Sequence, residues 1–351
     1  SGLPSRNGTF TANFRCVVPT VALTTPARPS LYGHGLFGSV NEVTAGNVQD
    51  MAAEHDMVFC GTNWVGMSND DIGTAAGILG DLSGFAKLAD RMQQAVLNFL
   101  FLGRLMKSSP GLAADAAFQN GEGKSVLAPG QLYYDGNSQG GIEGGVVTAV
   151  STDLTRSVLG VSGMNYSLLL PRSTDFEQFE AIMKPAYPSE LDRMLGLAAV
   201  QLEWDRSEPD GYANHMTTDP LPGTPQHQVL LQVALGDHQV SNYTADTMAR
   251  TIGAKAHCPA FDPGRLTDTR LLWGIDCLAS SSSTGSAIVY FDSGVPLPVL
   301  ANVMPPDGHD PHEDPRNDAA ARRQKSAFLQ PDATSRIIDV CDGAACHVEQ
   351  R

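Results

Sequence analysis

The segment Gly136-Asn-Ser-Gln-Gly140 carries the clearest chemical signal in the sequence. It fits the pattern G-x-S-x-G, in which a serine lies on a sharp turn between a strand and a helix. Such a match is not rare by composition alone, so its surroundings decide. Residues 131–135 resemble a strand, and residues 141–150 resemble a helix of small residues. Ser138 is therefore a candidate nucleophile, and the alternative is an ordinary glycine-rich turn with a capping serine.

A second glycine-rich segment, Gly33-His-Gly-Leu-Phe-Gly38, follows a short apolar run. Acyl transfer needs two backbone N–H groups that point at the developing oxyanion. We expect one from Gln139, the residue after the nucleophile, and the other from Leu36 or Phe37. The glycines allow the backbone to approach a substrate closely.

A serine hydroxyl also needs a base, and the base needs an orienting carboxylate. Asp237 directly follows the strand-like run 229–235, which suits this role, although an aspartate there is also a common helix cap. Segment 307–316 lies between the last expected strand and the last expected helix, and it contains His309 and His312. We favour His312 as the base because it is nearer the helix, with His309 as the alternative.

The same segment is rich in acidic residues, but its spacing matches no known metal cage, so we expect neither a metal nor a cofactor. Three further residues are weaker candidates for substrate contacts: Phe37 in the glycine-rich loop, and Trp64 and Asn165, each of which follows an expected strand. For Trp64, a place in the core is at least as compatible with the sequence.

Apolar patterns predict strands that alternate with helices along most of the chain. This order predicts an α/β fold in which a mostly parallel central sheet carries helices on both faces, as a single domain over residues 1–351. Proline-rich residues 165–228 break the alternation, and we interpret them as an inserted lid or cap. The expected strands are 9–18, 29–32, 57–60, 131–135, 158–161, 229–235 and 287–291, and the expected helices are 48–55, 82–106, 141–150, 243–252 and 315–329.

The net charge of −15 argues against nucleic acid as a partner, and the longest apolar run, 95–102, is too short to span a membrane. The six cysteines form no CxxC pair, and their even number favours three disulfides in a secreted, extracellular or periplasmic protein. The alternative is six free thiols in a cytosolic enzyme. Cys258 and Cys277 flank one loop, and Cys341 and Cys346 close another, so we expect each pair to be bonded.

Taken together, these motifs resemble the α/β-hydrolase superfamily, and segment 34–38 resembles the oxyanion loop of bacterial true lipases. The resemblance extends from about Thr9 to Leu329. It implies that Ser138 is the nucleophile, that Asp237 orients the base, and that Leu36 and Gln139 are the oxyanion donors.

The strand order of that superfamily also makes its second and fourth strands neighbours, which implies a disulfide between Cys16 and Cys60. The first strands of such folds would precede Thr9, where only eight residues remain. We therefore expect either a trimmed chain or a sheet that begins differently.

The resulting hypothesis is an exported serine esterase, similar to carboxylesterases and lipases, that forms an acyl-enzyme on small-molecule, lipid or polyester substrates. A serine peptidase or amidase could use the same site. The third alternative is a catalytically silent binding protein on the same fold.

Overall fold

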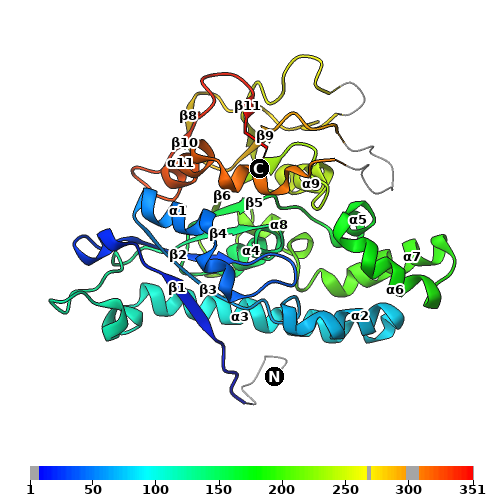
Figure 1. The fold of residues 1–351 in the computed structure, drawn as a ribbon, viewed down its shortest axis with the longest axis horizontal. Helices are drawn as coiled ribbons and strands as arrows, with labels where there is room; N and C mark the ends of the chain where they lie inside the picture. The colour runs from blue at the N-terminus through cyan, green and yellow to red at the C-terminus, as the bar shows by residue number, and fades with distance from the viewer. Residues whose placement is uncertain (1–7, 267–269, 298–307, 351) are drawn as a thin grey trace.

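A central sheet of nine strands organises the computed structural model, which describes residues 8–266, 270–297 and 308–350 (Figure 1). Its main path runs β1-β3-β2-β4-β5-β6-β9-β11, with β7 beside β9. Only β1 runs antiparallel to its neighbour. The strands are β1 (Phe14–Val17), β2 (Arg28–Gly33), β3 (Met57–Thr62), β4 (Tyr133–Asn137), β5 (Arg156–Gly160), β6 (Gln228–Ala234), β7 (Lys255–Ala256), β9 (Ala287–Asp292) and β11 (Cys346–His347), while β8 (Ser282–Ser283) and β10 (Ile337–Ile338) pair separately.

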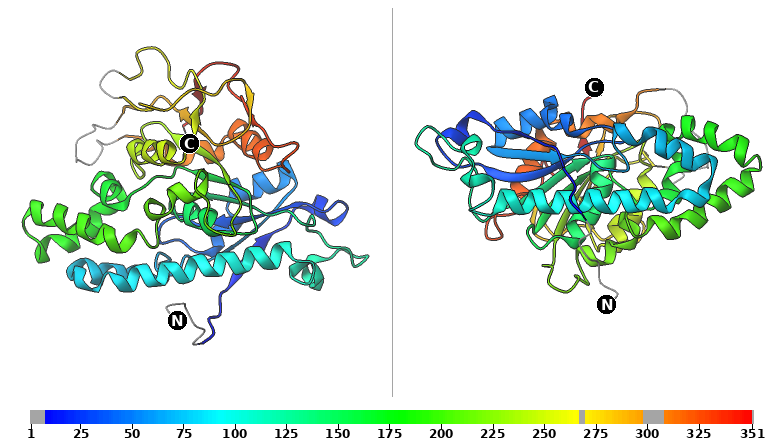
Figure 2. Two further views of the ribbon diagram at one scale, coloured as in Figure 1. Left: turned by 180° about the vertical axis from the view of Figure 1, so that it is seen from behind. Right: turned by 90° about the horizontal axis from the view of Figure 1, so that it is seen from below.

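Helices cover both faces of this sheet (Figures 1 and 2). Successive side chains of a strand point to opposite faces, so Leu31 joins the core under α3, α4 and α9, whereas Tyr32 joins the core under α1 and α11. The predicted α/β fold, a mostly parallel sheet with helices on both faces, is thus confirmed. The helices are α1 (Gly46–His55), α2 (Ile72–Gly80), α3 (Ala86–Lys107), α4 (Gln139–Val150), α5 (Tyr166–Leu169), α6 (Glu177–Ala186), α7 (Glu190–Trp204), α8 (Ala213–Met216), α9 (Asn242–Thr251), α10 (Asp314–Asn317) and α11 (Ala319–Phe328).

Two expected elements differ from the sequence prediction. The first strand is β1 alone, because residues 9–13 lie outside the sheet. The helix expected over residues 315–329 is divided at Asp318, whose side chain accepts hydrogen bonds from Ala320 N and Ala321 N and so caps α11. A local side-chain cap overrides a continuous helical pattern there.

The interval between β5 and β6 contains α5 to α8 instead of the single helix of a simple crossover. Helices α6 and α7 lie beside α2, which the sequence analysis did not anticipate (Figure 1). A separate apolar cluster joins these three helices: Leu79, Phe176, Phe179, Met183 and Leu197. We call α2, α5, α6 and α7, with the turns between α5 and α6, the cap.

All three predicted disulfides are present, and no described cysteine is free. Cys16 and Cys60 face each other directly across the antiparallel pair β1–β3. The Cys258–Cys277 and Cys341–Cys346 bonds close loops with sequence separations of 19 and 5 residues. Both edge strands of the main sheet path, β1 and β11, therefore contain a bonded cysteine. Among the described residues, no helix is both long and apolar enough to cross a bilayer.

Removing disulfides should destabilise the fold in proportion to the loop that each closes. The Cys16–Cys60 bond spans 44 residues, so the Cys16→Ala/Cys60→Ala variant should lose about 4 kcal/mol of unfolding free energy in the chain-entropy model. The Cys341→Ala/Cys346→Ala variant, with a separation of 5 residues, should lose about 2 kcal/mol. Urea unfolding of both variants measures the difference, and a larger loss for the short loop would contradict the prediction.

Candidate active site

Ser138 lies on the turn between β4 and α4, with φ of 60° and ψ of −127°. A side chain in this region of backbone space is strained by about 1–3 kcal/mol, which the surrounding structure must offset. The Ser138 N–H donates to Gly160 O at 3.0 Å, which ties the turn to β5. On the other face, the buried ion pair between Lys325 and Asp135 anchors β4 to α11. The strained turn therefore rests on fixed elements.

The glycines around Ser138 are required by close backbone contacts. A Cβ on Gly136 would lie 2.5 Å from Gly140 O, and a Cβ on Gly140 would overlap the backbone of Gly33 at the end of β2. The G-x-S-x-G spacing thus allows β4, α4 and the loop after β2 to meet without side chains between them. As a result, Ser138 lies next to the segment predicted to bind the oxyanion.

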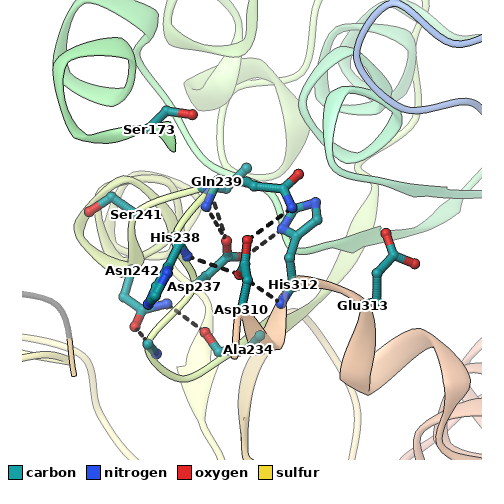
Figure 3. A network of polar contacts seen from close by, with 12 residues as sticks. Ser173, Ala234, Asp237, His238, Gln239, Ser241, Asn242, Asp310, His312 and Glu313 are labelled. Carbon is teal, nitrogen blue, oxygen red and sulfur yellow. Dashed lines mark hydrogen bonds and ion pairs between the residues drawn. The ribbon is translucent and has the colours of Figure 1, made fainter. Parts of the chain in front are cut away.

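Asp237 and His312 form a buried hydrogen-bonded pair (Figure 3). His312 Nδ1 lies 2.8 Å from Asp237 Oδ2, and both side chains are almost fully buried. The other carboxylate oxygen of Asp237 accepts hydrogen bonds from Gln239 N and Val240 N, each at 2.8 Å. The loop after β6 therefore holds the carboxylate in one orientation toward the imidazole.

The His312 imidazole is suited to take up a proton. Burial lowers its pKa, but the charge and hydrogen bond of Asp237 outweigh this effect and leave the pKa above the usual 6.5. The Nε2 atom is buried without a hydrogen-bond partner among the described residues, so the structure contains no hydrogen bond between Ser138 and His312, although both residues line one cavity. His309 instead bonds Asp314 at 2.9 Å, and the structure does not bring it to Asp237.

Asp310 links the loop that carries Asp237 to the loop that carries His312 (Figure 3). Its Oδ1 accepts hydrogen bonds from His238 N at 3.2 Å and His312 N at 3.1 Å. Its Oδ2 accepts a hydrogen bond from Gln239 Nε2 at 3.0 Å. Asp310 therefore joins the two loops through two backbone N–H groups and the side chain of Gln239, and it does not bond the His312 imidazole or the Asp237 carboxylate.

The glycine-rich loop after β2 leaves one of its two candidate donors available. Phe37 N–H donates to Met67 O at 3.1 Å and is therefore occupied. Neither Leu36 N–H nor Gln139 N–H has an acceptor within the described ranges. Leu36 lines two cavities together with Ser138, and Gln139 lines one of them. Leu36 and Gln139 thus have the free backbone donors that an oxyanion requires.

His34 and Glu42 hold this loop in shape. Trp64 N donates to His34 Nε2 at 2.9 Å, while His34 Nδ1 donates to Gly35 O at 2.8 Å. Burial lowers the pKa of His34 to about 4, so the ring is neutral and can make both bonds at neutral pH. Glu42 accepts a hydrogen bond from Gly35 N at 2.8 Å.

Ser138 lies where two cavities meet. The first, which we call the apolar cavity, has about 700 Å³ of empty volume and is lined mostly by aliphatic and aromatic side chains of the cap and α3. The second, the polar cavity, has about 1100 Å³ and is lined by His312 and by charged residues. The two share Leu36, Phe37, Ser138, Asp175, Phe179 and Gln239.

The three weaker candidates have different positions. Phe37 lines both cavities and packs against Phe179 with ring centroids 5.2 Å apart. Trp64 does not line either cavity; it is 1% exposed and stacks on Phe99 at 3.8 Å. Asn165 caps α5 through Leu168 N and donates to Asp210, so it supports the cap from outside the two cavities. Trp64 lies in the core because it packs between the sheet and Phe99 of α3.

Sequence reasoning missed a buried network next to the nucleophile. Tyr166 OH donates to Gln139 Oε1 at 2.6 Å, and Gln139 Nε2 donates to Glu143 Oε1 at 3.3 Å. Burial and then the nearby Glu208 raise the pKa of Glu143 well above its usual value, and burial raises that of Glu208 to about 8. The sequence contained one signal for this network: Glu143 is a single charged residue within the small-residue helix α4.

One group of carboxylates has the spacing of a metal site. Single oxygens of Asp205, Glu208 and Asp210 lie within 4.8 Å of one another. However, Gln201 Nε2 donates to both Asp205 and Glu208, so protein hydrogen bonds already serve this group. The cluster does not supply a metal-binding function by itself.

Glu143 should make stability depend on pH. Its folded pKa lies above the unfolded value of about 4.5, so the unfolded chain releases the proton first and stability falls as pH rises above 4.5. Glu143→Gln removes this loss, and its Tm relative to wild type should therefore be more favourable at pH 8 than at pH 5. Thermal unfolding measures this, with the exposed Glu122→Gln as control. A pH-independent difference would contradict the assignment.

No family model matches the sequence, and no curated protein matches it. Among solved structures, the fold is similar to that of Pyrococcus horikoshii acylaminoacyl peptidase in its orthorhombic crystal form, with a TM-score of 0.51 and 12% identity over 96% of this chain and 42% of that chain. The chain thus spans about two fifths of the length of that peptidase.

Two other similar structures are more distant. An S-formylglutathione hydrolase from Agrobacterium tumefaciens has a TM-score of 0.40 and 10% identity over 80% of this chain and 81% of that chain. A puromycin-hydrolyzing peptidase from Mycobacterium tuberculosis has a TM-score of 0.40 and 13% identity over 76% of this chain and 31% of that chain. The similarity to the acylaminoacyl peptidase, together with the parallel sheet, its two helical layers and the turn at Ser138, leads to one conclusion: the chain has the α/β-hydrolase fold.

Proposed function

We propose that the protein is a serine hydrolase that cleaves carboxylic esters through an acyl-enzyme. The observation that carries the proposal is the meeting of three features: a serine on a strained turn, a buried Asp237–His312 pair and two free backbone donors. Each feature alone has a structural explanation. Together they support a catalytic one, because Ser138 and Leu36 line the apolar cavity with Gln139 and the polar cavity with His312.

In this mechanism His312 Nε2 takes the proton of Ser138 as its Oγ attacks the ester carbonyl carbon. The Leu36 and Gln139 N–H groups stabilise the tetrahedral oxyanion, and Asp237 stabilises the imidazolium. The protonated imidazole then gives its proton to the departing alcohol. A water molecule, deprotonated by the same Nε2, attacks the acyl-enzyme and releases the carboxylic acid and Ser138.

The cavities support an apolar acyl group. Side chains such as Ile78, Leu79 and Phe176 surround the apolar cavity, and burial of a hydrocarbon chain there contributes about 25 cal/mol per Å². The alcohol would then leave through the polar cavity beside His312. Residues 165–228 act as part of a lid in this proposal, because α5 to α7 supply much of the apolar lining.

The same groups could open an amide bond, so a peptidase is the competing activity. Its oxyanion and nucleophile would be identical, and the protonated imidazole would give its proton to an amine. We also propose that the protein acts outside the cytosol, because three disulfides persist most readily in an oxidising compartment.

Ser138 should be the residue that forms the covalent intermediate. A fluorophosphonate probe should label wild type at Ser138, as mapped by peptide mass spectrometry, and Ser138→Ala should lower kcat for p-nitrophenyl esters on the order of 10⁶-fold. Labelling at another residue, or equal turnover by the variant, would refute the mechanism. Peptide p-nitroanilides assayed in parallel test the amide activity.

His312 and His309 should differ sharply as variants. His312→Ala should reduce kcat on the order of 10⁶-fold, whereas His309→Ala should change it by less than about 10-fold. Because the pKa of His312 is raised and the base acts unprotonated, kcat/KM of wild type should fall as pH drops through a value above 6.5. Loss of activity in His309→Ala alone would assign the base to His309.

A further inference from the structure

Asp175 occupies an unusual position at the junction of the two cavities. It lies on a short 3-10 turn, Thr174–Phe176, within the cap and lines both cavities together with Ser138. Among the described residues that line the apolar cavity, it is the only charged one. The carboxylate of Asp175 thus shares both cavities with Ser138, the proposed nucleophile.

The backbone around Asp175 is fixed to the core. Thr174 N and Thr174 Oγ1 both bond His238 O, at 3.0 and 3.2 Å, on the same loop as Asp237. Asp175 N donates to Ser173 Oγ at 3.2 Å. The carboxylate is therefore held near the reacting groups instead of at the end of a mobile loop.

No donor within the described ranges bonds the carboxylate oxygens of Asp175, although every other carboxylate around the site has a partner. Glu42 accepts from Gly35 N, and Glu313 pairs with Arg316. Asp310 accepts three hydrogen bonds from the loops beside it, and Asp237 holds His312. A half-buried charge without a partner is unfavourable, so its retention points to a partner from outside the chain.

The electrostatic surroundings favour a cation as that partner. The polar cavity is lined by Glu42, Asp175 and Glu313 against one guanidinium, Arg316. Its Nη1 pairs with Glu313, whereas its Nε and Nη2 are buried without a partner among the described residues. Burial raises the pKa of Asp175, His312 opposes this, and the negative charges of Asp237 and Asp310 raise it further. An ammonium group placed here would relieve both the burial cost and the repulsion.

We propose that Asp175 binds the α-ammonium group of the acyl part of the substrate, so that the preferred substrates are esters or amides of hydrophobic α-amino acids. The inference rests on the proposed hydrolase function. An α-amine is attached to the carbon next to the scissile carbonyl, which matches the junction beside Ser138. The amino-acid side chain then occupies the apolar cavity, and the alcohol or amine leaves through the polar cavity.

A matched pair of substrates tests this proposal. L-phenylalanine methyl ester and methyl 3-phenylpropanoate share one carbon skeleton and differ by the ammonium group. Wild type at pH 7 should prefer the amino ester in kcat/KM. Asp175→Asn should lower kcat/KM for the amino ester on the order of 10- to 100-fold and leave that for the neutral ester within about 3-fold. Asp192→Asn, an exposed carboxylate of the same cap, should change neither.

Equal losses for both esters in Asp175→Asn, or no preference in wild type, would overturn the substrate assignment while leaving the hydrolase intact. A binding measurement separates the two proposals. In calorimetry with Ser138→Ala, 2-phenylethylamine should bind more tightly than 2-phenylethanol, and adding Asp175→Asn should abolish the difference. If wild type cleaves neither ester but this difference appears, the hydrolase proposal fails and the ammonium site stands; if the difference is absent, the ammonium site fails.

Discussion

The close approach of three backbone segments is the constraint on which the site depends. The ends of β2 and β4 and the start of α4 meet where only glycine fits, at Gly33, Gly136 and Gly140. Any side chain there would separate the elements and move the turn that carries Ser138. Because the loop with the proposed oxyanion donor Leu36 continues directly from Gly33, the same contact sets the distance between Leu36 and the proposed nucleophile Ser138. One packing requirement therefore positions both Ser138 and the Leu36 N–H group.

Asp237 and His312, the proposed acid and base, are positioned by polar contacts instead of close packing. Asp237 is held by backbone N–H groups of its own loop, and Asp310 joins that loop to the one that carries His312. These bonds are buried and directional, so the imidazole has one orientation. The cap extends this arrangement, since Thr174 bonds the same loop through His238 O. The cavity entrance and the acid–base pair thus share one support.

The main features of the fold followed from local patterns that act over short distances. Apolar runs such as 229–235 predicted β6 within a residue, and the glycine spacing predicted the turn at Ser138, because both depend on neighbouring residues. The arrangement of the cap helices could not be predicted from such local patterns. Helix α2 packs against α6, which is far away in the sequence, and the apolar pattern of α2 does not indicate which helix it packs against. Trp64 and Glu143 illustrate the same limit, since their burial depends on tertiary contacts that no local spacing encodes.

The disulfides in the two edge strands have a further consequence when the protein partly unfolds. The exposed edges of a sheet are the places where chains associate with one another during partial unfolding. Here Cys16 fastens the edge strand β1 to β3, and Cys346 fastens the opposite edge, β11, to the preceding loop. A disulfide thus restrains the edge strand on each side of the sheet, which should hinder association between transiently opened molecules.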